Sequence, residues 1–179
     1  KVQVALAGAI VALSFAAIFF RLAAPTHPLV VAGTRLAIAA VVLAVPVVRA
    51  LRGGRLPQRV LRAAIVCGLL YGLHFGTWVT SLTMTSVASS VTLVTATPLL
   101  LAALALATGR DRPEPRHWAS IGLALVGLTA IGWADLSVSR EALVGDALAL
   151  AGAAAMAGYL QVVRGLGDEL DVLAFMGLA

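Results

Sequence analysis

The sequence predicts an all-α membrane protein, a polytopic bundle of transmembrane helices. Of its 179 residues, 61% are hydrophobic and only 12% are charged, whereas a soluble domain carries about 25% charged residues. Uncharged apolar runs recur at about the 20 residues that an α-helix needs to cross a bilayer. These runs lack the alternation of period two that is typical of membrane β-barrel strands. The expected fold is therefore helical.

Six spans and the start of a seventh are predicted along the chain. One run, 63–109, holds no Asp, Glu, Lys or Arg, and it is about twice the length of a crossing. It must therefore fold back on itself, and the small hydroxyl residues between Ser81 and Ser90 mark the turn. The predicted spans are 2–20, 22–48, 63–83, 87–107, 117–134 and 144–163, with 170–179 as the start of a seventh.

The second predicted span, 22–48, is the least regular of the six. It contains Pro25 and Pro28 near its start and one charge, Arg35, further in. Two half-spans or a re-entrant segment are the alternative interpretation. We favour a full crossing, because only then do arginine-rich connections alternate with arginine-poor ones.

Charges in the connections predict the orientation. One side holds little beyond Arg21 and Arg140, together with the acidic Asp135, Glu141 and Asp146. By the positive-inside rule, the arginine-rich connections and the N-terminus lie in the cytoplasm, as in a multi-pass protein of the plasma (inner) membrane. The arginines of these connections are Arg49, Arg52, Arg55, Arg59, Arg62, Arg110, Arg112 and Arg116.

The net charge of +5 therefore reflects topology. The 13 basic residues are separated by long uncharged runs, so they form no continuous stripe that could follow a phosphate backbone. The single Cys67 excludes an intramolecular disulfide framework and a CxxC zinc site. We expect the lipid bilayer as partner, and no nucleic acid, metal or cofactor.

A short repeat suggests two related halves. The pentapeptide Ala-Leu-Ala-Gly-Ala occurs at 5–9 and at 149–153, each time on a span that ends at an arginine. The second copy lies five spans further along the chain, so it enters the membrane from the opposite face. Inverted repeats are typical of secondary transporters, with the substrate site near the midplane. We predict a first five-helix repeat over residues 1–134 and the start of an inverted second repeat over residues 144–179.

Arg35 is the one permanent charge well inside a span. An intramembrane charge is costly unless it faces protein or water, which favours a role in the bundle interior. Its place about a quarter of the way into the span leaves snorkelling to the interface as the alternative.

The third span has two faces. Gly68, Gly72 and Gly76 recur every four residues and predict a groove for close packing of a neighbouring helix. The opposite sector is polar and aromatic, and we expect it to line a cavity; interface anchoring of the aromatic rings is the alternative. This sector holds Tyr71, His74, Trp78 and Ser81.

His74 is a candidate for proton coupling, because histidine titrates near neutral pH. The alternative is a histidine that is merely hydrogen-bonded to a neighbour. Thr77 and Trp78 occupy the positions three and four residues on, so a metal site on this helix is not expected.

The fourth span is rich in hydroxyl side chains and contains a proline. Pro98 lacks a backbone donor and frees the carbonyl of Val94, which predicts a kink. Ser90 and Thr97 share a narrow stripe with Ser86, which suits a passage for small amphipathic solutes. Ordinary packing of small residues is the alternative.

No enzyme is expected. The chain contains no GxSxG, HExxH or GxxxxGK[ST] motif. His74 and Ser81 lie two helical turns apart, about 10 Å along the axis, which is too far for a nucleophile and its base.

The run from Leu73 to Pro98 resembles the third and fourth helices of the EamA-type ten-helix transporters in the drug/metabolite transporter superfamily. The segment from Pro28 to Arg35 is similar to the part of that family in which an arginine follows an outer proline. Asp111 and Arg112 resemble its acidic–arginine pair before the fifth helix, with Asp in place of the usual Glu.

The resemblance implies a five-plus-five inverted repeat, alternating access and transport of small metabolites such as amino acids. Because about three helices of the second repeat are lacking, we expect either a fragment or two chains associated as a homodimer. A membrane-embedded structural or assembly subunit is the alternative function. The residues expected at the substrate cavity are Arg35, His74, Trp78, Ser81, Ser90 and Thr97.

Overall fold

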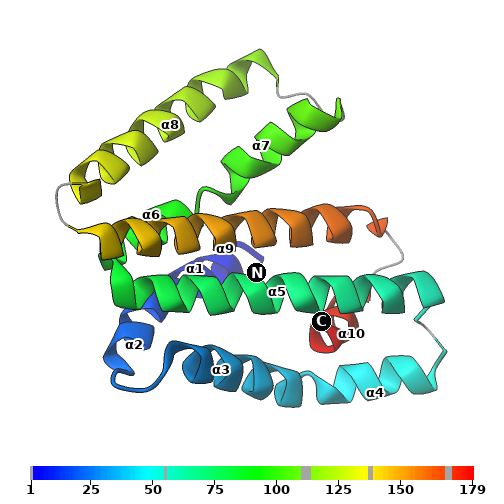
Figure 1. Cartoon of the computed structure of the whole chain (residues 1–179). Helices are drawn as coiled ribbons and strands as arrows, with labels where there is room; N and C mark the ends of the chain where they lie inside the picture. The colour runs from blue at the N-terminus through cyan, green and yellow to red at the C-terminus, as the bar shows by residue number, and fades with distance from the viewer. Residues whose placement is uncertain (1, 55, 110–113, 137–138, 168–170) are drawn as a thin grey trace.

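The computed structural model describes residues 2–54, 56–109, 114–136, 139–167 and 171–179. These residues form helices α1 to α10 and no strand (Figure 1). The helices are α1 (Val2–Ser14), α2 (Ala16–Leu22), α3 (Pro28–Val42), α4 (Ala44–Arg52), α5 (Gln58–Met84), α6 (Val87–Val94), α7 (Thr97–Thr108), α8 (Pro115–Leu136), α9 (Arg140–Arg164) and α10 (Val172–Leu178).

The predicted all-α membrane bundle is confirmed. Within the described residues, α5, α9 and the α6–α7 stretch Val87–Ala107 are long and apolar enough to cross a membrane, and α3 with α4 makes a fourth such stretch. Leu6–Leu22 and Trp118–Ala130 are shorter apolar helices. Three of the arginines used to predict topology, Arg55, Arg110 and Arg112, lie outside the described residues, as does Asp111 of the acidic–arginine pair.

The second predicted span is one helical stretch with a sharp bend. α3 and α4 meet at an angle of 50° at Leu43. Pro46 explains the break, because it has no N–H to donate to the carbonyl of Val42. α3 packs against α5, and in Figure 1 α4 continues along the same side of α5. A bent pair of this kind fits a single broken crossing, which we favour, as well as a re-entrant segment.

The centre of the fold is an antiparallel pair formed by α5 and α9 (Figure 1). Near the start of α5, Arg59 Nη2 donates a hydrogen bond to the carbonyl oxygen of Gly165 at 2.8 Å. Further along α5, His74 Nδ1 lies 2.8 Å from the carbonyl oxygen of Gly152. The remaining helices pack around this pair.

Glycines of α9 make this close approach possible. A Cβ at Gly145 would lie 2.9 Å from the backbone nitrogen of Thr85, and one at Gly152 would lie 3.0 Å from Thr77 Oγ1. Both distances are too short for an ordinary carbon contact. Gly145 therefore requires glycine if the two helices keep their spacing, whereas a side chain at Gly152 would require Thr77 and the nearby backbone to move by a few tenths of an ångström.

The predicted glycine groove on α5 is only partly occupied. A Cβ at Gly68 would lie 2.5 Å from the backbone oxygen of Ala179, and one at Gly76 would lie 3.4 Å from Leu29 Cδ2. Around Gly72 a Cβ would meet no atom of the described residues within 4 Å. The tight contacts with α9 are instead on the polar and aromatic face of α5.

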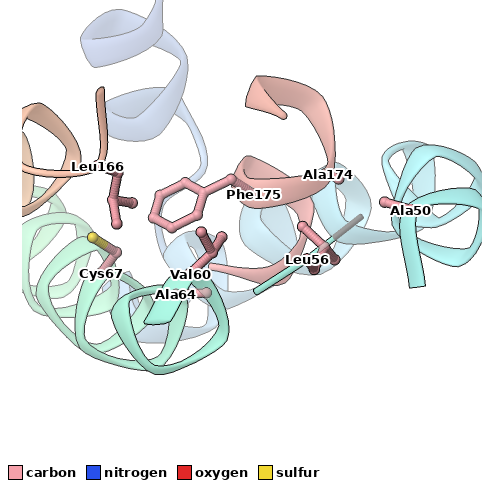
Figure 2. Close-up of a cluster of buried hydrophobic side chains, with 8 residues drawn as sticks. All are labelled: Ala50, Leu56, Val60, Ala64, Cys67, Leu166, Ala174 and Phe175. Atoms are coloured by element: carbon pink, nitrogen blue, oxygen red, sulfur yellow. The ribbon is translucent and has the colours of Figure 1, made fainter. Parts of the chain in front are cut away.

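A cluster of buried side chains fixes α10 against α4, α5 and the end of α9. Figure 2 shows the Phe175 ring directed toward Val60, Cys67 and Leu166. Gly177 rests on the α3–α4 bend, where a Cβ would lie 2.8 Å from Leu43 Cβ. The bend therefore provides the space into which α10 fits.

We predict that Gly145→Ala lowers the free energy of unfolding by about 1–3 kcal/mol, because the added methyl group overpacks the α5–α9 contact. The matched change Gly72→Ala adds the same methyl group in open space. It should be neutral or stabilising by up to about 1 kcal/mol, since alanine favours a helix. Thermal unfolding in detergent compares the two variants; a larger loss for Gly72→Ala would contradict this assignment of the packing faces.

Candidate functional site

Five of the six residues predicted at the cavity lie where α5, α6 and α7 meet their neighbours. His74, Trp78 and Ser81 belong to α5, while Ser90 and Thr97 belong to α6 and α7. All five are buried, and Ser81 and Ser90 are fully so. Arg35 on α3 is half-buried and lies on the other side of Phe75.

His74 is held by backbone and by aromatic rings. Because a carbonyl oxygen can only accept, Nδ1 carries the hydrogen in its 2.8 Å contact with the carbonyl of Gly152. The ring stacks between Tyr71 and Trp78, with centroid distances of 6.1 and 5.9 Å. This contact fixes the orientation and tautomer of the imidazole, while proton coupling through His74 stays a prediction.

Ser81 and Ser90 join α5 to α6 through a buried hydrogen bond of 2.6 Å between their hydroxyl oxygens. Ser81 Oγ also donates to the carbonyl oxygen of Trp78 at 2.7 Å. A hydroxyl has one hydrogen, so Ser90 is the donor in the bond between the two serines. Two consecutive hydrogen bonds thus run from the Ser90 hydroxyl to the Ser81 hydroxyl and on to the Trp78 carbonyl.

Thr97 supplies a hydroxyl for the carbonyl that Pro98 leaves without a backbone N–H donor. The helix is interrupted between α6 and α7 at Thr95 and Ala96, just before the proline. Thr97 Oγ1 lies 3.2 Å from the carbonyl oxygen of Val94, the acceptor that Pro98 leaves free. The same hydroxyl lies 3.5 Å from the carbonyl oxygen of Ala153 on α9.

Arg35 packs against aromatic rings. Its Cζ lies 4.0 Å from the ring centroid of Phe75 and 5.6 Å from that of Phe20. Trp78 touches the same two rings, at centroid distances of 5.7 Å from Phe75 and 5.6 Å from Phe20. Arg35 Nη1 and Trp78 Nε1 are both buried without a hydrogen-bond partner among the described residues.

Sequence analysis did not single out Phe20, Phe75 and Tyr159. Phe75 lies one residue beyond His74 and turns toward α3, where it belongs to the buried cluster with Val79 and Leu82. Their spacing of four and three residues is the usual signal of a core face. Tyr159 on α9 contacts Tyr71, with ring centroids 5.3 Å apart.

A cavity of about 840 Å³ lies between α1, α2 and α3. This volume is in the range of small-molecule sites, about 300–1,000 Å³. Of the six residues predicted at a cavity, only Arg35 lines this one. The lining is mostly apolar, and it includes Ala12, Ala16, Phe20, Val31, Thr34 and Arg35.

The other five predicted residues are not among those that line this cavity, and they lie in packed helix contacts, with Trp78 against the cavity-lining Phe20. Their hydroxyl and imidazole groups are bound to one another or to backbone carbonyls. Among the described residues, no three His, Cys, Asp or Glu side chains come together as a metal site would require.

We predict that Ser81→Ala lowers the free energy of unfolding by about 1–3 kcal/mol, because it leaves the buried Ser90 hydroxyl without its acceptor. Ser90→Ala should cost less, since Ser81 keeps its bond to the Trp78 carbonyl. The double variant should be no less stable than Ser81→Ala alone. A double-mutant cycle by thermal unfolding measures this, and purely additive losses would argue against the hydrogen-bonded chain.

Comparison with known proteins identifies the family to which the chain belongs. Neither the comparison with curated proteins nor that with solved structures found a match. The sequence model of the EamA-like transporter family matches residues 2–133. These residues include the cavity between α1, α2 and α3, helices α1 to α7 and nearly all of α8. The resemblance of the Leu73–Pro98 run to this family is therefore confirmed, and the chain belongs to the EamA-like transporter family, a family of membrane transporters in the drug/metabolite transporter superfamily.

Proposed function

We propose that the protein is a secondary transporter that moves small metabolites across the plasma membrane by alternating access. The observation that carries this proposal is the cavity of about 840 Å³ between α1, α2 and α3, which has one cation, Arg35, in a mostly apolar wall. Ligand sites have this composition, in which a few polar groups orient the ligand within an apolar pocket. Membership of a transporter family supports the same function and favours it over catalysis.

Helix directions support the inverted repeat that we propose, with residues 1–134 as one repeat and 144–179 as the opening of the next. Arg21, near the end of α2, donates from Nη1 to the carbonyl oxygen of Thr85 at 3.0 Å. The end of α2 therefore lies beside the end of α5. Gly145, near the start of α9, approaches the same residue. The α1–α2 stretch and α9 thus run in opposite directions, as the two copies of Ala-Leu-Ala-Gly-Ala require.

The proposed orientation places the N-terminus in the cytoplasm. Arg49, Arg52, Arg59 and Arg62 gather where α4 leads into α5. Arg140 and Glu141 begin α9 at the opposite end of α5. The excess of arginine at one end supports a cytoplasmic location for that end.

We predict that the full chain, reconstituted in lipid vesicles, takes up members of a panel of small anionic, zwitterionic and neutral metabolites in a saturable manner. Ala12→Phe should reduce this uptake several-fold, because the added ring fills the cavity that Ala12 lines. Ala124→Phe makes the same change at an exposed position of α8 and should leave uptake unchanged.

Radiolabel uptake and exchange against unlabelled solute provide the measurement. Absence of saturable uptake for every member of the panel would count against transport and favour a structural subunit. Equal inhibition by the two phenylalanine variants would show that the cavity between α1, α2 and α3 is not the route.

A further inference from the structure

We infer that Arg35 and Trp78 form an anion-binding position, and that the solute is an organic anion with an apolar body, a carboxylate being the simplest headgroup. This inference rests on the proposed transport function, since it names the class of solute. Its basis is the pair of buried donors, Arg35 Nη1 and Trp78 Nε1, that have no hydrogen-bond partner among the described residues.

The position of Arg35 favours a bound anion over snorkelling. Arg35 stands seven residues beyond Pro28, the first residue of α3, which places it about 10 Å along the helix. Its guanidinium packs over Phe75 and beside Phe20. The charge is therefore held within the bundle, where an unpaired cation is costly.

The aromatic rings stabilise the positive charge of Arg35 only in part. A ring face attracts a cation through its quadrupole but carries no net charge and accepts no strong hydrogen bond. Buried donors without acceptors are rare in proteins, and each one requires an explanation. A carboxylate supplies two oxygens, negative charge and the geometry that a guanidinium prefers.

The surroundings define the rest of the solute. Phe20 and Phe75 are shared neighbours of the two donor side chains, because each ring contacts both Arg35 and Trp78. The cavity wall beside Arg35 is formed by alanine, valine and phenylalanine side chains, with Thr26 and Thr34 as the other polar residues. An anion with an apolar body fits this wall, whereas a polyhydroxylated solute would leave most of its hydroxyls without partners.

Benzoate and its uncharged isostere benzamide are suitable probes. Equilibrium binding is measured on the full chain in nanodiscs of phosphatidylcholine alone. We expect wild type to bind benzoate about tenfold more tightly than benzamide or better, as a charge-assisted hydrogen bond requires. Equal affinity of the wild-type protein for the two probes would overturn the inference, and this comparison does not depend on any variant folding.

Variants then test which side chains cause the preference for benzoate over benzamide. Arg35→Gln should remove the preference for benzoate over benzamide, while Arg35→Lys should keep part of it because the charge remains without planar stacking. Trp78→Phe should weaken benzoate binding several-fold, since it removes the second donor. Arg62→Gln removes the same charge from an exposed position on α5 and should match wild type. A preference retained in Arg35→Gln would also overturn the inference.

A phospholipid headgroup is the other source of an anionic oxygen at this position. Nanodiscs that contain phosphatidylglycerol separate the two sources. Unchanged benzoate affinity in them supports a soluble anion, whereas loss of benzoate binding would assign the position to lipid and overturn the inference.

Uptake measurements separate this inference from the proposed function. Saturable uptake without preference for anions would leave transport standing and overturn the anion position. Selective benzoate binding without uptake of any solute would support the anion position and contradict transport.

Discussion

The antiparallel contact of α5 with α9 is the constraint on which the rest of the structure depends. Two apolar helices gain little from each other in lipid unless their backbones come close enough for dispersion contacts and interhelical hydrogen bonds. Gly145 and Gly152 provide that closeness on α9. The carbonyl of Gly152 is consequently within reach of His74. The polar and aromatic face of α5 is thereby committed to packing against α9 and α6, and the cavity forms on the side of α3.

The absence of water from a bilayer core explains how the buried polar groups are arranged. Each hydroxyl or imidazole needs a protein partner there, because lipid offers none. Ser81 and Thr97 accordingly bind carbonyl groups of their own helical stretch. The donors of Arg35 and Trp78 depart from this pattern, as does Thr85 Oγ1. Arg35 and Trp78 differ from Thr85 in that both contact Phe20, which lines the cavity. An unpartnered donor next to the cavity is what separates a candidate binding position from ordinary helix packing.

Much of the fold was predictable from the sequence, because span length, charge and proline positions act locally. The uncharged run 63–109 contains most of α5 and all of α6 and α7, with the turn where the hydroxyl residues predicted it. Pro98 likewise marks the interruption between α6 and α7. Which face of a helix packs against which neighbouring helix was less predictable. Glycine spacing on α5 indicates a groove, but whether a neighbour enters it depends on the whole bundle, and at Gly72 none of the described residues does so.

The role of the polar face of α5 was also only partly predictable from the sequence, for a different reason. A helical wheel correctly groups His74, Trp78 and Ser81 on one face of α5, but a polar face has two uses in a membrane. It can line a cavity, or it can satisfy polar groups against another helix, and the partner decides which. Here α9 offers glycine and bare carbonyl oxygens, so the face becomes an interface. Arg35 meets aromatic rings of α2 and α5 instead of carbonyl oxygens. Because its Nη1 has no acceptor among the described residues, a ligand explains this cation better than packing does.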